Sequence, residues 1–74
     1  MDDYANPLPT VIPMPHEYTF YQLGVKVEYC VKYAKKMNRK VEMNHNDTIV
    51  EVHPESYPPD IVQLWWYKRQ FENK

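Results

Sequence analysis

The fold is decided by residues 40–53, whose sequence is KVEMNHNDTIVEVH. Residues 44–47 (NHND) have side chains that tolerate the backbone conformations of a tight turn. On either side of this segment, apolar and polar residues alternate, which is the period of a half-buried β-strand. The stretch therefore predicts a β-hairpin at about residues 40–53.

The register of the hairpin follows from its side-chain pattern. We expect Val41 to lie opposite Val50 on one face of the two strands. The same register places Lys40 opposite Glu51 on the other face, an opposite-charge pair that contributes about 0.2–1 kcal/mol. The apolar pair and the charged pair thus agree on one pairing of the strands.

A helix is predicted on the N-terminal side of the hairpin, at about residues 20–37. Thr19 and Gln22 have the spacing of a capping box, and Asn38 suits a left-handed C-cap. Apolar side chains recur at three- and four-residue steps and predict a buried stripe, formed by Phe20, Leu23, Val27, Cys30, Ala34 and Met37. A strand over residues 25–33 is the alternative, because apolar and polar residues alternate there too, but it leaves the capping signature unexplained.

A second helix is predicted on the C-terminal side of the hairpin, at about residues 59–72. Pro58 and Pro59 fit its first turn, and Asp60 suits the positive end of the helix dipole. One face of this helix is expected to pack on the rest of the domain through Ile61, Leu64, Trp65, Lys68 and Phe71. The order of helix, hairpin and helix predicts a small two-layer α+β domain.

The N-terminal part of the chain is rich in proline. Four prolines within residues 7–15 exclude a helix there and favour an extended, Pro-rich arm over residues 1–18. Between these prolines, residues 10–12 (TVI) have the composition of a short edge strand. We therefore divide the chain into this arm and a single α-β-β-α domain over residues 19–74.

Length and composition exclude several classes of protein. A chain of 74 residues is too short for a two-domain enzyme or a doubly wound nucleotide-binding fold. Its single cysteine permits no internal disulfide, and its net charge of −1 gives no global attraction to nucleic acid or anionic membranes. The sequence shows neither a signal-peptide pattern nor the ~20 consecutive apolar residues of a membrane span, so we expect a cytoplasmic protein.

No catalytic pattern is found in the sequence. It contains no phosphate-binding loop, nucleophile elbow or C-x-x-C metal motif, so we expect no enzyme activity and no cofactor. His45, Asp47, Glu51 and His53 gather on the hairpin, but their spacing is not that of metal ligands and we expect no metal there. Cys30 falls on the apolar stripe of the first helix, which predicts a buried, inert thiol.

Aromatic side chains beyond those of the predicted core are the most informative feature of the sequence. On the first helix they recur at four-residue steps opposite the apolar stripe, and on the second helix Trp66 points to a different side from Trp65. The predicted partner-binding residues are Tyr21, Val25, Tyr29, Tyr33, Val62 and Trp66, and Lys26, Lys32 and Lys36 are interleaved with those of the first helix. Tyrosine and tryptophan are enriched among binding hot spots. The alternative is that both helices bury these side chains inside the domain.

Our leading functional hypothesis is a small, non-enzymatic protein-interaction module. We expect it to bind another protein, or a second copy of itself as a homodimer. Short chains with an acidic start and no catalytic motif are typical of accessory proteins of phages and mobile elements, which modulate or inhibit a host protein in the host cytoplasm.

Two other functions are compatible with the sequence. One is a nucleic-acid-binding regulator, although nucleic acid is a less favoured partner than protein. It would use the basic end of the first helix, where the candidate contacts are Lys32, Lys35, Lys36, Arg39 and Lys40. Cations also complement the C-terminal end of a helix dipole, and this structural role explains the same residues. A small structural subunit of a virion or another assembly is the second alternative.

Overall fold

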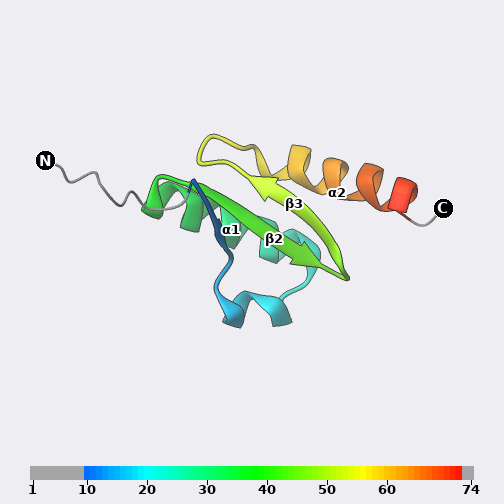
Figure 1. Ribbon diagram of the computed structural model, residues 1–74, viewed down its shortest axis with the longest axis horizontal. Helices are drawn as coiled ribbons and strands as arrows, with labels where there is room; N and C mark the ends of the chain where they lie inside the picture. The colour runs from blue at the N-terminus through cyan, green and yellow to red at the C-terminus, as the bar shows by residue number, and fades with distance from the viewer. Residues whose placement is uncertain (1–9, 73–74) are drawn as a thin grey trace, which may run out of the picture.

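The computed structural model describes residues 10–72 and consists of a three-stranded sheet and two main helices (Figure 1). The elements follow the order β1 (Val11–Pro13), the 3-10 helix η2 (His16–Phe20), α1 (Leu23–Met37), β2 (Lys40–His45), β3 (Thr48–Val52) and α2 (Pro58–Glu72). The predicted order of helix, hairpin and helix in a small α+β fold is confirmed. Of the predicted arm, residues 1–9 lie outside the described part of the chain.

β2 is the central strand of the sheet, with β1 parallel to it on one side and β3 antiparallel on the other. The backbone N–H of Lys40 donates to the carbonyl oxygen of Thr10, and that of Met14 donates to the carbonyl oxygen of Glu42, each with an N–O distance of 3.2 Å. The short edge strand predicted within the arm is therefore present. Since β1 and β2 are parallel, the chain must cross over between them, and α1 makes this crossover.

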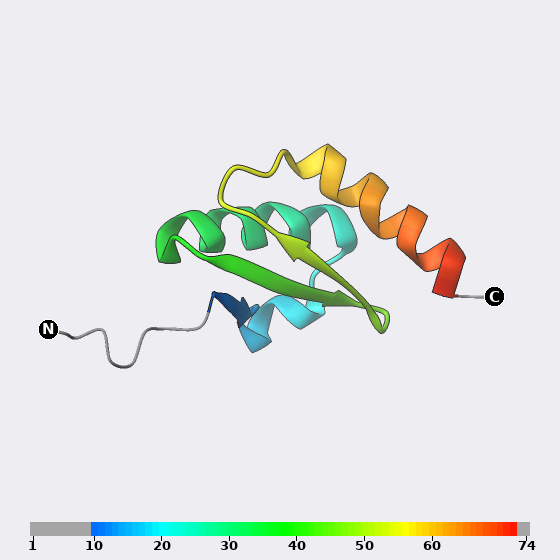
Figure 2. The same cartoon turned by 45° about the horizontal axis from the view of Figure 1, so that its top comes forward.

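Both helices lie on the same face of the hairpin, with α1 against β2 and α2 against β3 (Figure 2). The core lies between the sheet and the helices and contains ten buried side chains: Val27, Cys30, Val31, Ala34, Val41, Met43, Val50, Val52, Ile61 and Trp65. Each fully buried valine or methionine stabilises the fold by about 1.5–3 kcal/mol relative to an exposed one. The helix predicted over the first apolar stripe is confirmed, and the alternative strand over residues 25–33 is not formed.

The hairpin is present, but its register differs from the predicted one by two residues. Val41 lies opposite Val52, and Met43 lies opposite Val50. Only Asn46 and Asp47 form the turn, with φ angles of 51° and 67°. Two consecutive positive φ values are typical of a type I′ connection, whose twist matches that of the strands. β2 therefore extends two residues further toward the turn than predicted, whereas β3 begins at Thr48 as predicted.

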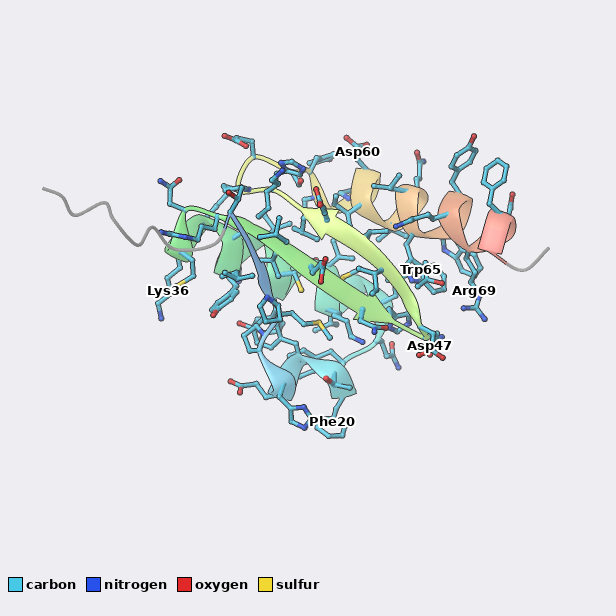
Figure 3. All side chains as sticks on the ribbon, in the orientation of Figure 1. Phe20, Lys36, Asp47, Asp60, Trp65 and Arg69 are labelled. Carbon is cyan, nitrogen blue, oxygen red and sulfur yellow. The ribbon has the colours of Figure 1, made fainter. Side chains whose placement is uncertain are left out.

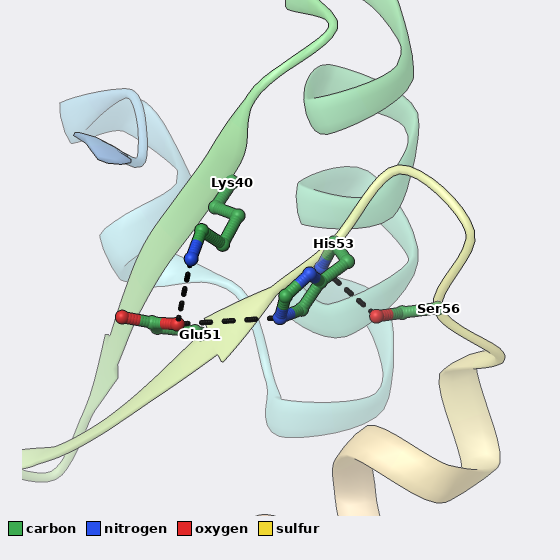
Figure 4. Close-up of polar contacts among 4 residues, drawn as sticks. All are labelled: Lys40, Glu51, His53 and Ser56. Carbon is green, nitrogen blue, oxygen red and sulfur yellow. Dashed lines mark hydrogen bonds and ion pairs between the residues drawn. The ribbon is translucent and has the colours of Figure 1, made fainter. Parts of the chain in front are cut away.

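A shift of two residues leaves every side chain on its predicted face, because side chains alternate with a period of two. Val41, Met43, Val50 and Val52 still point into the core, whereas Ile49 lies on the exposed face of β3. Glu42 now lies opposite Glu51, which is a like-charge pair. Lys40 is no longer directly opposite Glu51, but its ammonium still reaches that carboxylate diagonally, at 3.8 Å (Figure 4).

The start of α1 differs from its prediction. The helix begins at Leu23, its N-cap is Gln22, and no side-chain hydrogen bond caps it, so the capping box is not formed. The preceding residues form η2 instead, in which Pro15 accepts a hydrogen bond from the N–H of Tyr18 at 3.0 Å. Phe20 was expected in the buried stripe, but it lies on η2 and is 79% exposed (Figure 3). At the other end, Asn38 has φ 55° and is the predicted left-handed C-cap.

The two edges of the sheet present few groups for a further strand. In β1, Pro13 has no N–H group to donate to a neighbouring chain. In β3, the carbonyl oxygen of Ile49 accepts a hydrogen bond from the Lys68 ammonium. Directly after β3, the N–H of His53 donates to the Ser56 hydroxyl at 2.9 Å (Figure 4). Such blocked edges disfavour association by strand addition.

Candidate protein-binding surface

The predicted aromatic residues of the first helix form a tyrosine cluster with Tyr18 of η2. The ring of Tyr18 lies 5.7 Å from that of Tyr21, 5.4 Å from that of Tyr29 and 6.2 Å from that of Tyr33. The rings of Tyr21 and Tyr29 stack at 4.9 Å. Aromatic pairs of this kind contribute about 0.5–1.5 kcal/mol beyond the burial of their area. The structure thus brings three predicted partner-binding residues together and covers them in part with η2.

The other predicted partner-binding residues have different environments. Val25 is 44% exposed on α1, whereas Val62 is half-buried and packs against the core. Trp66 is 54% exposed on α2, and its ring meets the ring of the buried Trp65 at 4.9 Å. Figures 1 and 2 show η2, on which the tyrosine cluster packs, and α2, the helix that carries Trp66, on opposite sides of the molecule.

The solvent side of α2 carries the largest group of exposed apolar side chains on one element. Leu64 is 43%, Tyr67 61% and Phe71 58% exposed. Three- and four-residue steps place them on one face of the helix, and the rings of Tyr67 and Phe71 meet edge to face at 4.9 Å. We call these three residues and the exposed Trp66 the α2 outer face.

Of the α2 outer face, Trp66 was predicted from the sequence as a partner-binding residue, whereas Leu64, Tyr67 and Phe71 were not. Leu64 and Phe71 were expected to pack with Ile61 and Trp65, but only the latter two are buried. The core-facing side of α2 is rotated from its predicted position, because the half-buried Val62 and Arg69, and not Leu64 and Phe71, flank the buried Ile61 and Trp65. The three- and four-residue spacing of Leu64, Tyr67 and Phe71 in the sequence does indicate a second apolar stripe on this helix.

The basic end of α1 is partly engaged within the molecule. Arg39 donates to the carbonyl oxygen of Met37 at 2.7 Å, and Lys40 pairs with Glu51. The Lys32 ammonium lies 5.7 Å from the centre of the Tyr29 ring, a cation–π distance. The remaining candidate contacts, Lys35 and Lys36, are exposed in the last helical turn, where cations favour the helix dipole.

Lys26 is the residue whose environment differs most from the predicted one. It was expected among the exposed tyrosines, but it is only 2% exposed. Its ammonium donates to the carbonyl oxygen of Asn44 at 3.2 Å and lies 3.0 Å from Nδ1 of His45. Burial lowers the pKa of Lys26 and is also the main cause of the lowered pKa of His45. No sequence pattern marked this lysine, because its position is set by the strand that it meets.

The ammonium of Lys26 takes the place of a backbone donor. β1 pairs with the edge of β2 only as far as the carbonyl of Glu42. The chain then continues through Pro15, which has no N–H group to donate to β2. The next carbonyl on that edge belongs to Asn44, and Lys26 reaches it. Lys26 therefore acts structurally by satisfying the part of β2 that β1 leaves open.

The cysteine and the histidines show no metal-binding geometry. Cys30 is fully buried as predicted, and burial raises the pKa of its thiol to about 11. His53 Nε2 lies 4.0 Å from a Glu51 carboxylate oxygen (Figure 4), whereas His45 lies beside the turn at the other end of the strands. Within residues 10–72, no three His, Cys, Asp or Glu side chains are grouped so that they could hold a metal ion.

Comparison with known proteins gives no relative for this chain: no family model, no curated protein and no solved structure matches it. The described helices include none with the length and apolar character that crossing a membrane requires.

Proposed function

We propose that the protein is a small protein-binding module that docks on another protein through the α2 outer face. The observation that carries this proposal is the exposure of Trp66, Tyr67 and Phe71 on one short helix, at 54%, 61% and 58%. Exposed tryptophan and tyrosine at a helix surface are the residue types that dominate binding energy in protein interfaces.

The mode of binding that fits this face is insertion of a helix into an apolar groove of the partner. α2 has 15 residues and a length of about 22 Å, and four side chains give it less apolar area than the roughly 800 Å² per partner of a standard flat interface. A groove contacts each ring from several sides and so buries more of it. The small apolar area of α2 therefore favours a concave partner protein over a second copy of the chain.

In this proposal the main role of the tyrosine cluster is to stabilise the fold. Tyr21, Tyr29 and Tyr33 already contact Tyr18, so their removal changes stability as well as any binding. Blocked sheet edges and the internal contacts of Arg39 and Lys40 likewise favour α2 as the binding element. We place the module in the cytoplasm, in the host cytoplasm if a phage encodes it, as a modulator or inhibitor of a host protein.

The test starts with affinity capture from lysate and continues with the purified partner. The variant Trp66→Ala/Phe71→Ala should lower the affinity by more than about 30-fold, which corresponds to about 2 kcal/mol. Phe20→Ala is the matched control, because Phe20 is 79% exposed but lies on η2. Equal losses for both variants, or no loss for the α2 variant, would refute the proposal. Light scattering of the free protein reports whether the face is instead used for a homodimer.

A further inference from the structure

The turn end of the hairpin holds a buried cation without a carboxylate partner. Lys26 is 2% exposed, and both groups that contact its ammonium, the Asn44 carbonyl and the His45 ring nitrogen, are uncharged acceptors. Among the described residues, no carboxylate forms an ion pair with Lys26. The Cys30 thiol supplies no counter-charge either, because its pKa of about 11 keeps it protonated at neutral pH. A buried charge of this kind is unfavourable unless an opposite charge compensates for it.

A second cation lies at the same end of the hairpin. Arg69 Nη1 donates to the carbonyl oxygen of Asn46 at 3.2 Å, and its guanidinium lies 5.2 Å from the ring of Trp65 (Figure 3). Each cation donates to a carbonyl oxygen, which carries no full negative charge. At the hairpin tip Lys26 and Arg69 therefore outnumber the carboxylate of Asp47, although the whole chain has a net charge of −1.

A hollow of about 460 Å³ opens beside the Lys26 ammonium. It is lined by Met14, Thr19, Lys26, Asn44, His45, Asn46 and Asp47, so residues before α1, in α1 and in the hairpin converge on it. An ammonium has three N–H groups, and the two contacts of Lys26 leave the third for a ligand. The Thr19 hydroxyl and the asparagine amides are further donors in the lining. The volume falls in the range typical of small-molecule sites.

We propose that this hollow binds a small oxyanion, a phosphate or a carboxylate, with Lys26 as its buried charge partner and Thr19 as a second donor. This site is separate from the α2 outer face and does not depend on the protein-binding function. The bound anion compensates the Lys26 charge that the fold leaves unpaired. Asp47 is the carboxylate in the lining and opposes binding, because it carries the same charge as the ligand.

The experiment is an NMR titration of the ¹⁵N-labelled protein at pH 7 with sodium phosphate and, separately, with sodium acetate. Sodium chloride keeps the ionic strength constant, so general screening does not change. We expect saturable shifts of the amides of Thr19, Lys26 and His45, and the better of the two anions identifies the ligand class. Residues 35–39, at the basic end of α1, should not follow the same curve. Shifts that do not saturate, or that are equal at the hollow and at residues 35–39, overturn the proposal.

Two variants make the test specific. Asp47→Asn should tighten anion binding about threefold, as expected when one like charge is removed from a solvent-exposed position in the lining. Lys26→Met should abolish the saturable shifts, whereas the matched Lys32→Met, which removes an exposed cation from the same helix, should retain them. If Lys26→Met does not fold, the Asp47→Asn titration decides alone, and an unchanged affinity there contradicts the site.

Discussion

The indole nitrogen of Trp65 donates a hydrogen bond to the carbonyl oxygen of His45, with 3.0 Å between the two atoms. This bond fastens α2 to the turn end of the hairpin. Lys26 binds the preceding carbonyl, that of Asn44, and Arg69 binds the following one, that of Asn46. Three consecutive carbonyls of the hairpin are thus bound by side chains from both helices.

Replacing Trp65 by phenylalanine should destabilise the protein by about 2–3 kcal/mol. The change removes the hydrogen bond to His45, worth about 1 kcal/mol, and leaves a partly filled space in the core. Urea unfolding monitored by far-UV circular dichroism measures the loss. Trp66→Phe is the control on the neighbouring residue, which is 54% exposed, and it should change stability by less than about 0.5 kcal/mol. Equal effects at the two positions would show that Trp65 does not anchor α2.

Stability should decrease as the pH falls from 7.5 to 5, because of His45. Its pKa is lowered in the folded state by burial and by the neighbouring cations Lys26 and Arg69. As the pH falls below about 6.5, the unfolded chain therefore binds this proton before the folded protein does, and the free energy of unfolding decreases. The decrease continues until the pH has passed the folded-state pKa.

The variant His45→Gln tests this origin of the pH dependence. Glutamine retains an oxygen that can accept from Lys26, but it does not titrate. Denaturant midpoints measured at intervals between pH 7.5 and 5 should be flatter for the variant than for the native sequence. Parallel curves would assign the pH dependence to other groups.

Glycine in place of Asp47 should stabilise the hairpin by about 0.4–1 kcal/mol. Asp47 has φ 67°, a conformation that glycine adopts without strain, and asparagine followed by glycine is the preferred pair in a type I′ turn. Thermal unfolding should show a higher midpoint for Asp47→Gly. A lower midpoint would indicate that the side chain of Asp47 has a stabilising contact that outweighs its backbone strain.

Removal of Tyr18 should cost more stability than removal of Phe20, although both lie on η2. Tyr18 contacts the rings of Tyr21, Tyr29 and Tyr33, whereas Phe20 is 79% exposed. We expect Tyr18→Ala to lower the free energy of unfolding by more than about 1 kcal/mol, and Phe20→Ala by less than about 0.5 kcal/mol. Chemical denaturation of the two variants, side by side, compares them directly. A reversed order would mean that η2 does not pack on α1 through Tyr18.

The hairpin and both helices were predictable because each is specified by neighbouring residues. Periods of two and of three to four identify the elements, and Asn38 ends α1 where its sequence indicates. The sequence pattern does not distinguish the observed hairpin register from one shifted by two residues, because both place every side chain on the same face of the sheet. The turn conformation of Asn46 and Asp47 decides it.

The candidate surface and the hollow depend on contacts between distant segments. Lys26 is buried because β1 ends before it covers the carbonyl of Asn44, 18 residues away in the chain. Nothing in the helix containing Lys26 distinguishes it from the exposed Lys32. Likewise, Leu64 is exposed because other side chains already complete the core side of α2, which the sequence of α2 alone does not reveal.

The parallel pairing of β1 with β2 has a consequence for the order of folding. Residues 11–13 precede their partners, residues 40–42, by 29 positions, whereas β2 and β3 are joined by a two-residue turn. During synthesis β1 emerges first but has no strand to join until α1 and β2 have followed it. We expect β1 to dock late, with φ values near zero for Ile12→Val in refolding kinetics, and higher values at Val50 in the hairpin.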